Sequence, residues 1–182
     1  DRYLFQSWIA TRLRTLARLY AGDGEGALQG MEADLPRLKK AKLDSLQLVR
    51  IESLDLLGRC CIATVSQSAD GTLKRRLERL RGVIDALEEI PRAHALGPAA
   101  SFRAALATIE GRFDEAASRL AAAEAHYERA GMDMHRLAVA WHRARLLRDV
   151  PERGRIEAAL RELGVRNPAS WAQMYLPLGA SC

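Results

Sequence analysis

Aromatic residues, cysteines and long apolar runs are all scarce in this sequence. Aromatic side chains make up 5% of its 182 residues, whereas hydrophobic residues make up 48%, so a core must consist mainly of Leu, Ala, Ile and Val. Charged residues interrupt the apolar stretches, which leaves no run close to the roughly 20 apolar residues that span a membrane. We therefore expect a single domain, residues 1–182, that has no membrane-spanning segment and folds without disulfides.

The few cysteines exclude both a disulfide framework and a metal-ligand spacing. Cys60 and Cys61 are adjacent, and the third cysteine is the last residue. Adjacent helical residues point about 100° apart, so we expect one of the pair to lie in the core. A redox role would require an exposed thiol with a lowered pKa, which no pattern here indicates. This cysteine usage predicts a reducing, cytoplasmic setting.

The sequence opens with Asp1-Arg2-Tyr3 instead of Met. It also lacks the charged, apolar and small-residue regions that follow one another in a secretory signal. We therefore expect a fragment of a longer protein.

Motifs of phosphoryl-transfer catalysis are absent from the sequence. There is no G-x-G-x-x-G loop, no lysine in a V-A-I-K context, no H-R-D, no D-F-G and no Walker A motif. The tripeptide Leu147-Arg148-Asp149 has Leu where a kinase catalytic loop needs His. We predict that this chain is not an enzyme and holds no cofactor.

The four histidines do not match a known metal motif, since none stands in an H-E-x-x-H pattern. His135 and His142 are seven residues apart, hence near one side of a helix, and His126 lies in the preceding helix. A metal site needs at least three converging ligands in fixed geometry. Capping or surface positions are therefore the favoured interpretation, and we predict no metal.

Positive charge is in moderate excess, with a net charge of +5 and a pI near 9.4. The basic residues gather in two groups: Lys39, Lys40 and Lys42, and then Lys74, Arg75, Arg76, Arg79 and Arg81. The first group suits the negative end of a helix dipole, whereas the second opposes the positive end. A solvated surface, partly offset by Glu78, Glu88 and Glu89, is the favoured interpretation, and nucleic-acid binding is the alternative.

Turn signals alternate with helical periodicity along the chain. They occur at residues 21–24, 68–71, 110–112 and 149–151, at roughly forty-residue intervals. Each separates two segments with Leu and Ala three or four residues apart, and no segment alternates like a β-strand. The sequence predicts an all-α fold of about four stacked antiparallel helical hairpins and a short last helix: residues 2–40, 43–90, 96–130, 132–164 and 168–175.

Several single positions have specific expected roles. Pro36 should kink or shorten the second helix. Thr72 should cap the helix that follows the second turn. Trp141 belongs to an apolar stripe and should lie in the core, while Trp8 and Trp171 should cover the end hairpins, which have no further neighbour.

Residues 110–116, Glu-Gly-Arg-Phe-Asp-Glu-Ala, resemble the turn between the two helices of a tetratricopeptide repeat. Residues 21–28 are similar, with Gly24 at the aromatic position. The Trp, Leu, Gly and Tyr pattern of a strict first helix is missing. The resemblance implies degenerate repeats in a right-handed superhelix and carries over no groove residues of that family.

Two further segments, LDSLQLVRIESLDLLG at 43–58 and LGVRNPASWAQMYLPL at 163–178, resemble the C-terminal region of large bacterial serine/threonine kinases. In that family a kinase domain is followed by an ATPase-like segment and a tetratricopeptide-like tail. The resemblance implies a regulatory or partner-binding tail of a signalling protein. It implies no kinase activity for this chain.

In a curved array of hairpins, the first helices line the inner surface. The polar residues of those helices are the candidate partner-binding residues: Arg12, Gln47, Arg50, Ser101, Arg103 and His142. A purely structural role for the same residues is the alternative.

These observations favour a non-catalytic protein-interaction or regulatory module that binds a protein or peptide partner, including other domains of its parent chain. One alternative is an effector-sensing domain of a multidomain ATPase-type regulator, with a small molecule or peptide in the superhelical groove. A nucleic-acid-associated helical repeat that uses the basic clusters is the other. We expect no membrane partner.

Overall fold

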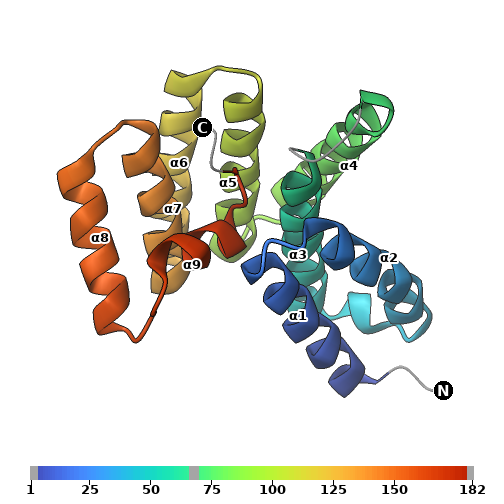
Figure 1. Ribbon diagram of the computed structural model, residues 1–182. Helices are drawn as coiled ribbons and strands as arrows, with labels where there is room; N and C mark the ends of the chain where they lie inside the picture. The colour runs from blue at the N-terminus through green and yellow to red at the C-terminus, as the bar shows by residue number, and fades with distance from the viewer. Residues whose placement is uncertain (1–3, 66–69, 180–182) are drawn as a thin grey trace.

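The computed structural model describes residues 4–65 and 70–179, and within these ranges the chain is helical without a β-strand (Figure 1). The α-helices are α1 (Phe5–Tyr20), α2 (Gly24–Lys40), α3 (Gln47–Val65), α4 (Asp70–Glu88), α5 (Ala93–Ile109), α6 (Phe113–Arg129), α7 (Asp133–Leu146), α8 (Val150–Glu162) and α9 (Pro168–Tyr175). A short 3₁₀ helix, η1 (Leu43–Ser45), precedes α3. The all-α prediction is confirmed, whereas the handedness of a superhelix stays a prediction.

Consecutive helices pack against each other in pairs, α1 with α2, α3 with α4, α5 with α6 and α7 with α8 (Figure 1). Each pair overlaps one of the predicted segments, although α5 begins at Ala93, before the predicted residue 96. In addition, α3 contacts both α1 and α5, so the first helices of three pairs lie side by side. Residues 56–62 of α3 are all buried, because neighbours cover this helix on several sides. None of the described helices is both long and apolar enough to cross a bilayer.

Left-handed residues end several helices and let the chain turn back. After α1, Gly22 has a φ of 80°, and the Asp23 N–H donates a hydrogen bond of 2.9 Å to the Arg18 carbonyl. Gly111 has the same role after α5, with a φ of 75°. This is the pattern of a Schellman cap, in which glycine adopts the left-handed conformation without steric cost. After α7 the non-glycine residue Arg148 takes this conformation instead, with a φ of 57°.

Two single-position predictions need correction. Pro36 does not shorten its helix, since α2 continues through it to Lys40, and the alternative of a kink stays a prediction. Leu38 is buried beyond the proline, and its packing favours a helical last turn. Thr72 is not a cap, because α4 begins at Asp70 and already includes it. Ser68 and Ala69 of the predicted turn lie outside the described residues.

The cysteine pair is more deeply buried than predicted. Both Cys60 and Cys61 lie in the core as free thiols, whereas we expected only one of them there. The two side chains point in different directions, but α3 has packed neighbours on both of these sides. Burial raises the pKa of Cys61 to about 11 and also raises that of Cys60, which makes a thiolate role unfavourable.

The core has a large part around α1 to α6 and a smaller part around α7 to α9. Trp8 and Trp141 are buried in these two parts, which for Trp141 is the expected position. Trp171 is half-buried and packs against both. Alanine-rich surfaces let the helices of the second part approach closely: Ala138, Ala140, Ala144 and Ala172 are buried there.

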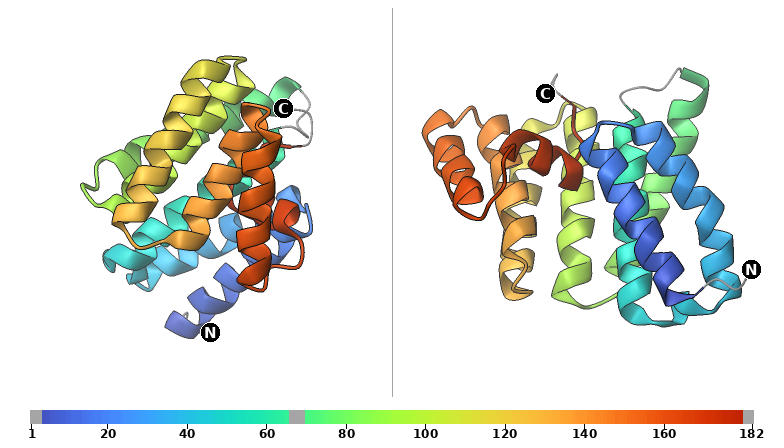
Figure 2. Two further views of the ribbon diagram at one scale, coloured as in Figure 1. Left: turned by 90° about the vertical axis from the view of Figure 1, so that its left-hand side faces the viewer. Right: turned by 60° about the horizontal axis from the view of Figure 1, so that its bottom comes forward.

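The last helix connects the two ends of the array. In the right-hand view of Figure 2, α9 lies between the α7–α8 pair and α1, and it contacts all three helices. Beyond α9, Leu176 and Leu178 are buried in the large part of the core. The Arg145 side chain donates a hydrogen bond of 2.7 Å to the Gly179 carbonyl. The segment after α9 thus packs onto the large part of the core and is bonded to α7.

Candidate functional site

A cavity of about 320 Å³ lies where the first helices meet α9. Its walls come from α1, α3, α5, α7 and α9 and from the turn between α6 and α7. The apolar walls are Leu16, Leu48, Ile51, Leu56, Pro98, Ala130 and Met132. The polar lining consists of Arg12, Glu52, Asp55, Arg59, His94, His135 and Tyr175. Apolar walls with a few converging polar groups are typical of ligand sites, and this volume is near the lower end of their range.

Helical periodicity explains why these side chains converge. Residues three or four positions apart share a helix face. The lining residues have this spacing on three helices: Leu48, Glu52, Asp55 and Arg59 on α3, Arg12 and Leu16 on α1, and His94 and Pro98 on α5. The packing of α3 between α1 and α5 then directs these faces toward one space.

A buried ion pair between Asp55 and Arg59 forms one wall of the cavity. The Arg59 Nε donates to Asp55 Oδ1 at 3.0 Å, and its Nη2 contacts Oδ2, which makes a bidentate pair. The side chains are only 14% and 3% exposed. Desolvation raises the pKa of the Asp55 carboxyl, and the adjacent guanidinium opposes that shift. The Arg59 charge therefore favours the ionised form of Asp55, and without Asp55 the guanidinium would be an unpaired charge in the interior.

Aromatic rings connect this ion pair to α6, α7 and α9. The Arg59 guanidinium lies 4.5 Å from the centre of the Tyr175 ring, a cation–π distance. His135 packs between Tyr175 and Tyr127, with ring centroids at 4.5 and 5.3 Å. Burial, together with the nearby Arg59 and Arg12 charges, lowers the pKa of His135 to about 3. His135 is therefore neutral at pH 7.

A second, more exposed ion pair lies beside the first. Arg12 Nε is 3.5 Å from Glu52 Oε1, and the Trp8 indole N–H donates to Glu52 Oε2 at 3.4 Å. Each of the four carboxylate oxygens of Glu52 and Asp55 thus has one N–H group as a contact. Within residues 4–65 and 70–179, neither the Nη atoms of Arg12 nor the Tyr175 hydroxyl has a hydrogen-bond partner. The Arg12 Nη groups and the Tyr175 hydroxyl are therefore donors that a ligand can use, while each carboxylate oxygen can still accept a further hydrogen bond.

The structure does not bring the six predicted binding residues together. Arg12 lines the cavity, and Gln47 is exposed at the start of α3. Arg50 lines a separate hollow of about 340 Å³ between α2, α3 and α4. Ser101 is 2% exposed and bonds the Gly97 carbonyl.

The other two predicted residues also have partners inside the protein. Arg103 bonds Glu88 and Asp85 of α4. His142 is 1% exposed, and its Nε2 lies 3.0 Å from the Ala172 carbonyl. Burial lowers the pKa of His142 to about 3. Neither Ser101 nor His142 therefore presents a surface to a partner.

Sequence reasoning missed most of the polar lining. Glu52, Asp55 and Arg59 are charged residues at helical spacing inside an otherwise leucine-rich segment, and Asp55 and Arg59 are an i, i+4 pair. That pattern could have marked a polar stripe on α3. No local pattern could have indicated that Tyr175 contacts Arg59, because the two residues are 116 positions apart in the sequence and meet only in the folded chain.

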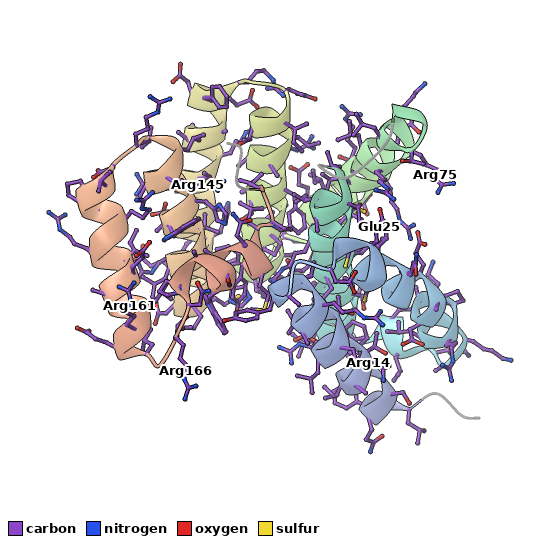
Figure 3. All side chains as sticks on the ribbon, viewed as in Figure 1. Arg14, Glu25, Arg75, Arg145, Arg161 and Arg166 are labelled. Carbon is purple, nitrogen blue, oxygen red and sulfur yellow. The ribbon has the colours of Figure 1, made fainter. Side chains whose placement is uncertain are left out.

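The other sites considered from sequence have structural explanations. No cluster of His, Cys, Asp or Glu in the described part of the chain could hold a metal ion. In the basic group of α4, Arg76 pairs with Glu25 and Arg79 with Glu32, so these cations join α4 to α2. Arg75 is exposed and points away from the other helices (Figure 3).

Comparisons of this chain with protein-family models, with curated proteins and with solved structures give no match. The resemblances to tetratricopeptide repeats and to kinase tails therefore stay predictions from the sequence.

Proposed function

We propose that this chain is a non-catalytic protein-interaction module that binds a segment of a protein or peptide partner at the cavity between α1, α3 and α9. The supporting observation is the cavity itself, which has apolar walls and converging donors from five helices. Leu48 at the edge of the cavity is 61% exposed, so its apolar side chain is available for contact with a bound partner.

The surface beside α9 also has the chemistry of peptide binding. The segment after α9 packs there against the core, with two buried leucines and one carbonyl bonded to Arg145. A partner segment would use the same two kinds of contact, apolar side chains in hollows and polar contacts to the backbone. The resemblance to bacterial kinase tails suggests that the partner includes other domains of a parent chain. Buried free thiols at Cys60 and Cys61 agree with a cytoplasmic site of action.

Two matched leucine variants test this proposal. A library of peptides, displayed as internal segments of a carrier protein, would be screened for binding to this chain. The affinity of the selected peptides would then be compared for the Leu48→Asp and Leu163→Asp variants. Both leucines are exposed, at 61% and 59%, so neither change should affect folding. We expect a loss of about tenfold or more in affinity for Leu48→Asp alone, because the charge would lie at the edge of the site. Equal effects of the two variants, or no selected peptide, would contradict the proposal.

A direct assay tests the non-catalytic part of the proposal. We expect neither ATP hydrolysis nor phosphotransfer by the purified chain, since the motifs for both are missing. Turnover that co-purifies with the chain and disappears in a Leu48→Asp variant would contradict this part.

Effector sensing is the second candidate, because a cavity of about 320 Å³ also suits a small molecule. Nucleic-acid binding has less support, since Arg76 and Arg79 are already paired with glutamates.

A further inference from the structure

The lining of the cavity offers hydrogen-bond donors that restrict its ligand. Arg12, Arg59, Glu52 and Asp55 give two positive and two negative charges, so a formal count would suggest no preference. The contacts among these groups distinguish them. Asp55 bonds Arg59, and Glu52 contacts Arg12 Nε and the Trp8 indole N–H, so positive or N–H groups already face both carboxylates. Arg12 contacts Glu52 through Nε, and among the described residues its two Nη groups have no hydrogen-bond partner. A ligand in the cavity can therefore bond both Nη groups of Arg12.

The position of these donors favours an anion with an apolar body. The Arg12 side chain is 40% exposed and lines the cavity together with Leu16 of the same helix. The two Nη groups of an arginine present parallel N–H bonds that match the two oxygens of a carboxylate. Ile51 and Met132 provide apolar walls beside these donors.

The charges of Arg59 and Arg12 both act on His135. Arg59 and Arg12 are both close enough to disfavour a proton on His135. The neutral His135 can donate one ring N–H and adds no charge. Tyr175, whose hydroxyl has no partner among the described residues, supplies a further donor from α9.

We propose that this cavity binds a carboxylate attached to a small apolar group, with Arg12 as the residue that contacts the carboxylate. This chemistry occurs in the C-terminal residue of a peptide and in a free apolar acid. The inference rests on the proposed binding role of this surface and specifies which end of a partner segment enters the cavity. Capture of a C-terminal carboxylate is a recurring mode of peptide recognition.

Four probes distinguish the sources of the carboxylate. The first pair is acetyl-Ala-Ala-Leu with a free C-terminus and the same peptide as a C-terminal amide. Each would be titrated into the whole chain, and binding would be measured by calorimetry and by shifts of the backbone amide NMR signals. The free acid 4-methylpentanoate and the alcohol 4-methylpentanol form the second pair. We expect each acid to bind about tenfold or more tightly than its neutral counterpart, as the loss of a charge-assisted hydrogen bond predicts. Tighter binding of the peptide acid identifies a chain terminus, and equal binding of both acids identifies a small-molecule effector.

Arg12→Gln and Arg14→Gln are the matched variants for this test. Both arginines are on α1, but Arg14 is 64% exposed and pairs with Asp34 outside the cavity. Arg12→Gln should abolish the preference for acid over amide, and Arg14→Gln should keep it. Ala130→Phe, which fills the cavity from the α6–α7 turn, should abolish binding of every probe.

Failure of this inference can be separated from failure of the proposed function. If acid and amide bind equally and Ala130→Phe removes both, the surface binds peptides and the carboxylate assignment is wrong. The assignment is also overturned if Arg12→Gln binds the acids like the unchanged chain. If no probe binds at millimolar concentration, the carboxylate site is again refuted, while selection of internal peptides would still test the wider proposal.

Discussion

Arg59 shows how strongly one residue can depend on a single partner. Its side chain is 3% exposed, and the charge is balanced by Asp55 and by the face of Tyr175. A buried ion pair is weak evidence for stability as a pair, but removal of one partner leaves an uncompensated charge in the interior. The two residues should therefore respond very differently to single and double substitution.

We expect Asp55→Ala to lower the free energy of unfolding by about 3–5 kcal/mol, because Arg59 would keep its charge without a partner. The double variant Asp55→Ala/Arg59→Met should recover a large part of that loss. Urea denaturation of the three proteins measures both effects. A double variant that is less stable than Asp55→Ala alone would contradict this expectation, because it would show that the Arg59 side chain stabilises the folded state even without its partner.

Two helical glycines provide a second comparison at this scale. A Cβ at Gly58 would be 2.2 Å from Cε2 of the Phe102 ring, whereas a Cβ at Gly82 meets nothing within 4 Å. Gly58→Ala should cost about 1–3 kcal/mol, because the buried ring cannot move freely. Gly82→Ala should instead add about 0.5–1 kcal/mol, since alanine has less backbone entropy to lose on folding. Thermal unfolding of both variants checks the opposite signs, and equal signs would contradict the packing described here.

At the scale of elements, the sequence predicts the helices well because their signals are local. The residues around Gly22 and Gly111 identified two turns, and the Leu and Ala spacing identified the helices beside them. Fine detail was less predictable: burial of Leu38 preserves the helix after Pro36, which is a tertiary effect. The cavity was not predictable, because its lining depends on where α1, α3, α5, α7 and α9 meet. Of the six proposed binding residues, only Arg12 lines it.

The segment that follows α9 should be sensitive to substitution. We expect Leu176→Ala to destabilise the chain by about 2–5 kcal/mol, because the leucine is fully buried in the large part of the core. Hydrogen exchange should accelerate in α9 more than in α3, since local contacts of α9 are lost first. Leu163→Ala, at an exposed position, is the control and should change stability by about 0.5 kcal/mol or less. Equal exchange rates in α3 and α9 would contradict a local role.

For the whole molecule, buried histidines predict a loss of stability in acid. Burial lowers the pKa of both His135 and His142 to about 3, compared with about 6.5 in an unfolded chain. The folded state then binds fewer protons, so this contribution is fully present above pH 6.5 and is lost as the pH falls toward 3. Each histidine contributes a slope of up to about 1.4 kcal/mol per pH unit.

Substitution of one histidine tests this pH dependence. His142→Gln should reduce the fall in unfolding free energy between pH 7 and pH 5, whatever its own cost at pH 7, because one titrating group is removed. Urea denaturation at several pH values gives the slope for both proteins. An unchanged slope would mean that His142 does not titrate as its burial requires.

The contact between α9 and α1 has a consequence for how such a chain can change in length. In an open solenoid each unit touches only its neighbours, so a unit can be gained or lost at little cost. Here the final helix also contacts the first, and both contribute to the same hollow. An extra hairpin inserted at the α6–α7 turn would separate α9 from α1 and open that hollow. Duplication of a single hairpin at this turn would therefore remove the contact between α9 and α1 together with the cavity.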